Sequence, residues 1–437
     1  MRPGDRPRPP GEGGALRTSG ALALFGLAIA VQLQAQAANP DAAEVYRRFA
    51  PRVVKIQAVE RSSGAKSAIG SGFFVSPAGH VITNYHVISA LVHEPSRYRA
   101  DLIDNRDATR PVEILAVDVV HDLAVLQVAP ADDPWFPLAG VRVERGTRLY
   151  SMGHPLDLGL SIVEGTYNGL LEHTLYPRIH FTGSINPGMS GGPTITADGR
   201  VVGVNVATAG EQVSFLVPVE RVVALVHEVE RPGYQRPDTL LRDVGRQLLD
   251  YQETYLSRLF ADSTPTITLG GYVVPTSPAP FFKCWGDASH GGGRTYDTIA
   301  HQCSTDDYVY ISEDQWSGVL QIRHLVLTAR GLGRMRFYAM YSRQFEGTGL
   351  EAQSRDVVSP VRCTAANVRQ TGLVLKTVFC TRRYRRLPGL YDAYLKVAAL
   401  GAPDTGLVTT LTLSGVTYAN AHRMAARYLA SVGRARQ

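Results

Sequence analysis

Three separate segments of this sequence carry side chains that could together perform acyl transfer. Ser190 lies in a glycine-rich stretch, between Gly188 and Gly191. A serine hydroxyl is a weak nucleophile at neutral pH, so it needs a nearby base, and a histidine oriented by a carboxylate can serve. His86 and Asp122 precede Ser190 in the chain. The order His, Asp, Ser is one of several in which unrelated folds present such a triad.

The segments around these residues form an ordered series of motifs. The series consists of Gly70-Ser71-Gly72-Phe73-Phe74-Val75, Val81-Ile82-Thr83-Asn84-Tyr85-His86, Asp122-Leu123-Ala124-Val125, Asn186-Pro187-Gly188-Met189-Ser190-Gly191-Gly192-Pro193, Gly199 to Asn205, and Phe215-Leu216-Val217-Pro218. This series resembles the trypsin-like serine proteases, and within them the HtrA/Deg type. The resemblance runs from Asp41 to Glu230. Several motifs in the right order are far more specific than any one of them alone.

The resemblance implies a mainly β protease domain of two six-stranded barrels, the chymotrypsin-like fold. It implies that His86 is the base, Asp122 orients it, and Ser190 is the nucleophile. The backbone N–H groups of Gly188 and Ser190 would form the oxyanion hole, where losing one donor typically costs about 3 kcal/mol. The expected substrates are polypeptides.

The same alignment of motifs indicates where a substrate side chain would bind. Ser184 would form the floor of the primary pocket with Ile185 beside it, and Val206, Ala207 and Thr208 would form the opposite wall. None of these residues is a carboxylate, so we expect a small or medium aliphatic side chain before the scissile bond rather than Arg or Lys.

Three features depart from the family. Met189 precedes the nucleophile where the family usually has asparagine and digestive proteases have aspartate, and Tyr85 replaces a smaller residue before the base. The family commonly has a PDZ peptide-binding domain after the protease, and none is recognisable here. These departures keep an alternative open, in which the chain is a latent or inactive protease fold that binds or regulates a partner.

The N-terminus has the pattern of a secretory signal peptide over residues 1–37. Arginines precede an apolar run from Ala21 to Val31, and Ala35-Gln36-Ala37 offers small residues for cleavage before Ala38. We therefore expect an exported protein, periplasmic in a bacterium, with secretion or a signal anchor as alternatives. No later segment has the length and hydropathy of a membrane span.

All four cysteines, Cys284, Cys303, Cys363 and Cys380, lie in the C-terminal half. An even number in an exported chain suggests disulfides, with three pairings open. We favour pairing of sequence neighbours, Cys284 with Cys303 and Cys363 with Cys380. No Cys-x-x-Cys spacing supports zinc, and no metal or other cofactor is expected.

The segments between the motifs predict the domain organisation. Short β-branched runs separated by turn residues predict strands from residue 51 to 218, and helices are expected over 41–49 and 219–230. Residues 38–230 are thus assigned to the protease domain, 231–237 to a linker, and 238–437 to a separate α+β domain of unknown fold. In that domain we expect helices over 238–260 and 419–432. The apolar stripe of the first could pack as core or form a partner surface, and we favour core.

The composition excludes some functions and leaves others open. With 44% hydrophobic and 19% charged residues the chain is globular, and a formal charge of +6 without a recognisable module gives no reason to expect nucleic-acid binding. The basic run over 382–386 is interpreted as a solvated edge or loop. An acidic and histidine-containing stretch could make the C-terminal half a second enzyme; it comprises Asp287, His290, Asp297, His301, Asp306 and Asp307. A protein partner of that half and a homo-oligomeric state also stay open.

Overall fold

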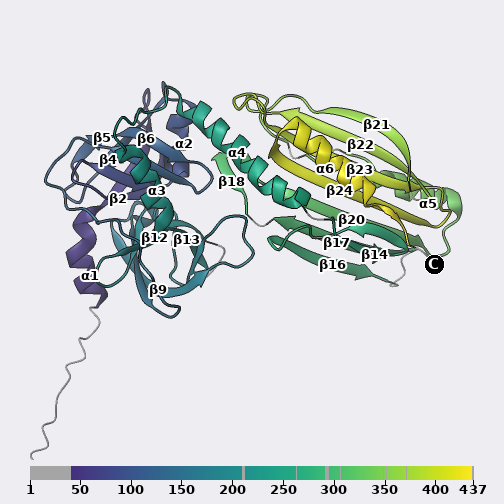
Figure 1. Ribbon diagram of the computed structural model, residues 1–437, viewed down its shortest axis with the longest axis horizontal. Helices are drawn as coiled ribbons and strands as arrows, with labels where there is room; N and C mark the ends of the chain where they lie inside the picture. Colours follow the sequence, from purple (N-terminus) through teal and green to yellow (C-terminus); the bar gives the residue numbers. More distant parts are fainter. Residues whose placement is uncertain are drawn as a thin grey trace, which may run out of the picture. The chain divides into compact units, whose positions relative to one another are not determined.

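The computed structural model describes residues 41–208, 212–261, 263–290, 295–305, 307–347, 349–350, 352–370 and 372–435. The expected signal peptide lies outside these residues. Residues 40–437 form one compact unit (Figure 1). Helix α1, Ala42–Phe49, begins it, and Asp41 caps this helix by accepting the N–H of Glu44 at 2.7 Å.

Residues 38–230, assigned from the sequence to a protease domain, are called the protease region below. Its first part is a sheet of seven antiparallel strands in the order β5-β4-β1-β2-β3-β7-β6. Their bounds are β1 Val53–Glu60, β2 Lys66–Phe74, β3 His80–Thr83, β4 Tyr98–Ile103, β5 Thr109–Pro111, β6 Glu113–Asp118 and β7 Leu123–Gln127. Helix α2, Tyr85–His93, follows β3. This helix was not predicted, because only strands were expected between residues 51 and 218, although Val87, Ile88, Leu91 and Val92 recur at helical spacing.

The second part is a closed barrel of six strands in the order β10-β13-β12-β11-β8-β9. Its strands are β8 Arg148–Gly153, β9 Ser161–Leu170, β10 Ile179–Phe181, β11 Pro193–Ile195, β12 Val201–Thr208 and β13 Ser214–Pro218. Helix α3, Val219–Glu230, follows as expected, and its apolar residues pack between the two parts. The mainly β, two-part fold is confirmed, although the first part is a seven-stranded sheet rather than a closed ring of six.

Helix α4, Leu240–Ala261, contributes to two hydrophobic cores. Val244 and Leu248, in its first half, pack in the core of the first protease sheet. Tyr255 and Leu256, in its second half, pack in the core of the C-terminal sheet. The stripe predicted from its sequence is therefore core, and it joins the two regions along one helix.

The C-terminal region is built on seven antiparallel strands in the order β16-β17-β20-β24-β23-β22-β21. They are β16 Phe282–Ser289, β17 Tyr296–Thr305, β20 Leu320–Ala329, β21 Arg362–Gln370, β22 Leu373–Arg383, β23 Tyr391–Leu400 and β24 Thr405–Val416. Helix α6, Tyr418–Ala430, packs on this sheet together with the end of α4 (Figure 1). Helix α5, Arg334–Arg343, was not predicted.

Five further strands among the described residues of this region form two small sheets. β14 Thr266–Leu269 and β15 Tyr272–Pro275 pair with the short β25, Gly433–Arg434. β18 Val309–Ser312 and β19 Gln315–Ser317 form a hairpin of their own. Its first strand, β18, contacts helix α2.

Both expected disulfides are present, and each joins directly opposed residues on adjacent strands. Cys284 on β16 bonds Cys303 on β17, and Cys363 on β21 bonds Cys380 on β22. This is the pairing of sequence neighbours that the spacing favoured. The bridges therefore fasten the two outer strand pairs of the C-terminal sheet.

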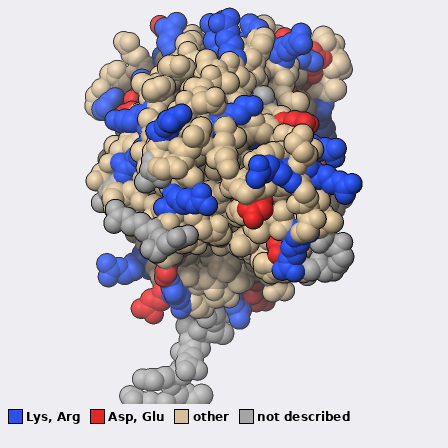
Figure 2. Space-filling view, turned by 90° about the vertical axis from the view of Figure 1, so that its right-hand side faces the viewer, with Lys and Arg blue, Asp and Glu red and all other residues tan. Residues whose placement is uncertain are grey.

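The basic run over 382–386 does not form one charged patch. Arg382 is buried and paired with Asp392 at 2.8 Å, while Arg386 lies 4.0 Å from Glu94 of the protease region. On the face shown in Figure 2, basic side chains are spread over the surface with acidic ones between them. Among the helices of the described residues, none is both long and apolar enough to cross a membrane.

Candidate active site

His86 and Asp122 lie together at the N-terminus of helix α2. Asp122 Oδ2 lies 2.6 Å from Nδ1 of the His86 ring, and its Oδ1 accepts the backbone N–H of His86 at 2.8 Å. The first N–H groups of a helix have no partner within the helix and attract negative charge. One carboxylate therefore fixes both the backbone and the ring of His86.

The backbone around Asp122 is shaped for this contact. Asp122 has a φ of 57°, in the left-handed region that aspartate tolerates better than most residues. Its carbonyl accepts a hydrogen bond from the Asn84 side chain at 2.7 Å. The neighbouring His121 pairs instead with Asp118, at 2.7 Å, so it does not compete for this carboxylate.

The environment of His86 changes its proton affinity. Burial disfavours the charged imidazole and by itself lowers the pKa, but the charge of Asp122 and its hydrogen bond outweigh burial, so the pKa of His86 is raised. A raised pKa means that the carboxylate stabilises the imidazolium. That is the form a histidine takes after it accepts a proton from a nucleophile.

Ser190 lies on a loop between β10 and β11 that requires glycine at two positions. Gly188 and Gly191 have φ values of 95° and 85°. A Cβ at Gly188 would collide with the carbonyl of His154, and one at Gly191 with the carbonyl of Ser71. The glycines therefore let the loop press against β2 and against the segment after β8.

Ser71 of β2 ties this loop to the first sheet. Its backbone N–H donates to the carbonyl of Ser190 at 2.7 Å. Its hydroxyl donates to the carbonyl of Gly188 at 2.8 Å and accepts the N–H of His154 at 2.9 Å. Ser71 is fully buried, so these bonds are shielded from water. The sequence marked Ser71 only as part of a motif and did not reveal this role.

The hydroxyl of Ser190 lies 3.5 Å from the carbonyl of Val206. The preceding peptide is oriented by Leu156, whose N–H donates to the carbonyl of Pro187 at 2.9 Å. In a trans peptide the carbonyl and the next N–H point to opposite sides. The N–H of Gly188 therefore points away from the Leu156 segment.

The segment that holds this peptide is itself fixed to the first sheet. Asp157 pairs with Lys55 of β1 at 2.9 Å and with Lys66 of β2 at 2.6 Å. Hydrogen bonds from Lys66 and Lys55 lower the pKa of Asp157 to about 2. The carboxylate is thus charged at neutral pH, and it anchors the turn that contains Leu156.

Met189 and Asn205 fix the loop that carries Ser190 to the closed barrel. Met189 is fully buried and packs with Phe181 and Ile185 in the closed barrel. Asn205 is also buried, and its amide donates to the carbonyls of Met189 and Met152, both at 3.1 Å. At the Met189 position, where a carboxylate or amide was expected in the family, apolar burial fixes the loop.

The residues expected to line the primary pocket occupy different environments. Ser184 is exposed, whereas Ile185 is buried in the barrel with Met189. Val206 is half-buried on β12, and the backbone of Ala207 and Thr208 continues that strand opposite β13. Their assignment to a pocket stays a prediction.

Tyr85, the second departure from the family, contacts the C-terminal region. Its ring is fully buried, and its hydroxyl donates to the carbonyl of Ile311 on β18 at 3.0 Å. Ile311 and its neighbour Val309 belong to the same hydrophobic core as Tyr85. The larger side chain therefore does not disturb α2, because the partner strand accommodates it.

Several of the polar residues singled out in the C-terminal half pair with neighbouring side chains. Asp307 pairs with Arg178 at 3.3 Å, and Asp297 lies 3.7 Å from His290. Asp306 lies outside the described residues. These contacts give no sign of a second catalytic centre.

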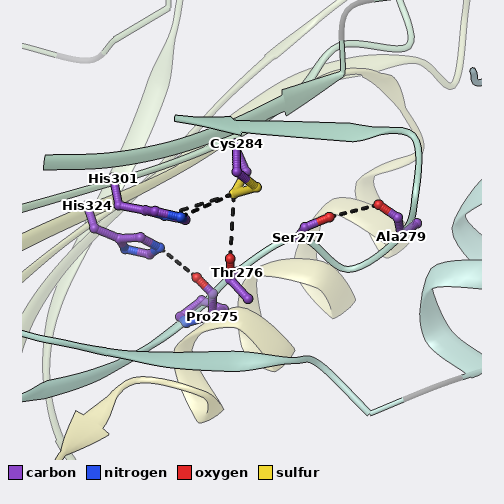
Figure 3. Close-up of a disulfide and its surroundings, with 8 residues drawn as sticks. Pro275, Thr276, Ser277, Ala279, Cys284, His301 and His324 are labelled. Atoms are coloured by element: carbon purple, nitrogen blue, oxygen red, sulfur yellow. Dashed lines mark hydrogen bonds between the residues drawn. A yellow bond between two sulfur atoms is a disulfide. The ribbon is translucent and has the colours of Figure 1, made fainter. Parts of the chain in front are cut away.

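Among the described residues, the one group of three potential metal ligands is Cys284, Cys303 and His301. The two sulfurs are bonded to each other, and the His301 ring points at them, with nitrogens 3.9 and 4.0 Å from Cys303 Sγ (Figure 3). Oxidised sulfurs offer no thiolate ligand. The group is therefore a disulfide with an adjacent imidazole.

Comparisons with known proteins place the similarity over the two protease parts. Residues 70–204, which contain His86, Asp122 and Ser190, match the family model described as the trypsin-like peptidase domain. The chain is 32% identical over 203 residues to the mitochondrial serine protease HTRA2 of Bos taurus, covering 43% of each chain. It is 28% identical over 222 residues to a probable periplasmic serine endoprotease, DegP-like, of Marinomonas sp. (strain MWYL1), covering 47% of this chain and 46% of the relative.

The chain thus spans less than half the length of these two relatives. Among solved structures, a serine endoprotease from Yersinia pestis is similar, with 25% identity and a TM-score of 0.39. That similarity covers 45% of this chain and 68% of the other.

The effect of Asp122 on His86 can be measured by NMR titration of the histidine rings. In a Ser190→Ala background we expect the His86 midpoint above about 6.5, the value of a free histidine. Asp122→Asn should bring it below that value, because burial remains while the charge is lost. His324, whose pKa burial lowers to about 4, serves as an internal control that should not move.

The raised pKa of His86 determines how its contact with Asp122 changes the folding stability with pH. The carboxylate contact adds to folding stability at pH values below the pKa of the unfolded histidine, and this contribution is lost as the pH rises through the folded pKa. A His86 midpoint that Asp122→Asn leaves unchanged would contradict the assignment of Asp122.

Ser71→Ala tests whether the tie between sheet and loop positions Ser190. The variant leaves the Gly188 carbonyl and the His154 N–H without their partner, so we expect a loss of about 2 kcal/mol in unfolding free energy. Reaction of Ser190 with a fluorophosphonate should slow by about tenfold or more, since the loop carries the N–H donors.

Thr305→Val is the matched control, because the buried Thr305 hydroxyl likewise donates to a carbonyl, that of Gly318 at 3.3 Å, and accepts an N–H, that of Leu320 at 3.1 Å, in the C-terminal region. It should cost similar stability but leave the labelling rate within about threefold, less than 1 kcal/mol. Equal slowing in both variants would show that Ser71 acts only through stability.

Proposed function

We propose that this chain, whose residues 70–204 are a trypsin-like peptidase domain, is a serine endopeptidase with His86, Asp122 and Ser190 as its triad. The observation that carries the proposal is the bidentate contact of Asp122 with the His86 ring and backbone. A carboxylate that serves only as a helix cap needs no bond to the ring. The ring contact selects the tautomer with the proton on Nδ1, which leaves Nε2 free to act as a base.

In the proposed reaction, Ser190 Oγ attacks the carbonyl carbon of the scissile peptide while His86 takes its proton. The imidazolium, stabilised by Asp122, then protonates the leaving amine as the C–N bond breaks. Water, deprotonated by His86, hydrolyses the resulting acyl-enzyme and restores the Ser190 hydroxyl. His86 must be neutral to begin the cycle, so activity is expected to rise with pH through its raised pKa.

The N–H groups of Gly188 and Ser190 are proposed to bind the oxyanion. The Pro187 carbonyl turned toward Leu156 supports this, because it leaves the Gly188 N–H directed away from that segment. Preorganised donors of this kind are usually the largest single contribution to catalysis. The primary pocket is proposed to take small or medium aliphatic side chains, between Ser184 and Val206.

A latent protease fold is the second candidate, and one observation favours it. The Ser190 hydroxyl lies near the Val206 carbonyl, a contact that directs its proton away from a base. Rotating the Ser190 side chain about χ1 crosses a much lower energy barrier than rearranging the loop would. Labelling of Ser190 distinguishes a site that needs only this rotation from one that is disabled.

We also propose that the protein is exported and acts on envelope proteins in the periplasm, by degradation or processing. The pattern of residues 1–37 supports export, and so does the presence of two disulfides, which persist in oxidising compartments. The similarity to a relative named as periplasmic agrees with this location. A protein partner and a homo-oligomeric state are part of the same proposal.

The direct test is labelling of the protein from Ala38 onward by a fluorophosphonate probe. We expect covalent labelling that is absent in Ser190→Ala, because the probe reacts with serines activated by an assembled base and oxyanion hole. Absence of labelling in well-folded wild-type protein would overturn the endopeptidase proposal in favour of the latent fold. Labelling that persists in Ser190→Ala would overturn the choice of nucleophile.

A further inference from the structure

A cavity of about 230 Å³ lies beside His86, and the C-terminal region supplies one of its walls. Ser67 and Ala68 of β2 and Ser89 of α2 contribute on the protease side. Tyr310 of β18 contributes from the C-terminal side. Since His86 itself is part of the lining, whatever occupies this cavity lies next to the reacting groups.

Tyr310 is held in place by the strand that carries it. Residues on a strand alternate between its two faces. Val309 and Ile311 are therefore buried in the protease core, while Tyr310 faces the cavity between them. The Ile311 carbonyl bonds Tyr85 at 3.0 Å and His93 Nε2 at 2.9 Å. Both bonds attach the residue after Tyr310 to helix α2.

The ring of Tyr310 contacts the side chains that flank the candidate base. Its centroid lies 5.9 Å from that of His86, at an interplanar angle of 72°, and 6.4 Å from that of Tyr85. Its hydroxyl lies 3.4 Å from the Ser89 hydroxyl. The edge-to-face packing leaves the tyrosine half-buried, with part of its surface free to meet a ligand.

Among the described residues, the cavity is lined by the candidate base but not by β12, the strand expected to line the primary pocket. His86 must reach the leaving amine to protonate it, so the departing segment of the substrate passes next to this ring. The acyl segment binds on the other side, along β12 and the proposed primary pocket.

The charges around Tyr310 define the chemistry of a fitting side chain. The lining contains the carboxylates of Glu94, Glu313, Asp314 and Asp356 against the single guanidinium of Arg386. Glu94 pairs with Arg97 at 3.3 Å and lies 4.0 Å from Arg386, so the negative charge in excess comes from the other three carboxylates. An aromatic ring beside excess negative charge suits a Lys or Arg side chain, whose cation is attracted by both.

We propose that Tyr310 is a specificity-determining residue and that this cavity takes a Lys or Arg side chain of the substrate residue just after the scissile bond. The C-terminal region then acts as part of the protease's substrate cleft. The inference rests on the proposed endopeptidase function. The cavity differs from the primary pocket in position and in charge preference, because the primary pocket accepts the residue before the scissile bond.

The test uses peptides that share one acyl sequence and carry lysine, or the uncharged norleucine of similar length, after the scissile bond. We expect wild-type kcat/KM to favour lysine by about fivefold or more, the size of one cation–π contact. Tyr310→Ala should lose most of this ratio, whereas Tyr310→Phe should keep it because the ring remains. Asp314→Asn should reduce it.

Two controls separate substrate recognition from damage to the site. Tyr308→Ala removes an exposed tyrosine from the same chain segment, outside the cavity lining, and should leave the ratio unchanged. An ester with the same acyl part and a small alcohol as leaving group cannot fill the cavity. Slowing of this ester in Tyr310→Ala therefore measures any effect on His86, and the slowing of the lysine peptide should exceed it by about fivefold.

The outcomes are distinguishable. A lysine-to-norleucine ratio that is near one in wild type, or unchanged in Tyr310→Ala, would overturn the inference while the protease proposal stands. Equal slowing of ester and peptide in Tyr310→Ala would overturn it too, since the ring would then act on His86 rather than on substrate. Wild-type protein that hydrolyses neither compound would overturn the proposed function and this inference with it.

Discussion

The candidate site depends on a fixed position of the closed barrel relative to the seven-stranded sheet. Ser71 is the residue that connects the two most directly. The base lies at the start of helix α2 and its carboxylate in the turn between β6 and β7, whereas the nucleophile lies on a loop of the closed barrel. Ser71 bonds the carbonyls of Ser190 and Gly188 from β2, at 2.7 and 2.8 Å. The glycines at 188 and 191 permit the close approach that these bonds require. Without such a tie, the separation between base and nucleophile would vary with every movement between the two parts.

The C-terminal region is attached to the same machinery through two elements. Helix α4 shares its apolar residues between the protease core and the C-terminal sheet. Strand β18 places Tyr310 against His86 and bonds the hydroxyl of Tyr85. A C-terminal domain that only tethered the protein or recruited a partner would have no reason to pack beside the candidate base. The arrangement instead makes the helix that carries His86 a shared element of both regions.

Much of the protease fold, and the choice of His86, Asp122 and Ser190 as candidates, followed from the sequence, because both depend on local patterns. The strands, α1, α3 and the disulfide pairing are set by alternation, caps and short spacing, and the structure confirmed them. The roles of Ser71 and Tyr310 did not follow. Ser71 acts through bonds to residues 117 and 83 positions away, and Tyr310 meets Ser89 across 221 positions. Such contacts depend on how completed elements pack, which no local pattern records.

The central claim, that side chains from the two β structures act as one catalytic unit, can be tested by a double-mutant cycle in kcat. His86→Ala and Ser190→Ala are measured singly and together on one peptide substrate. Residues that act as a unit show strongly non-additive losses. The account predicts that the double variant is no slower than either single variant. Losses that multiply, with the double variant slower by the product of the two single effects, would contradict it.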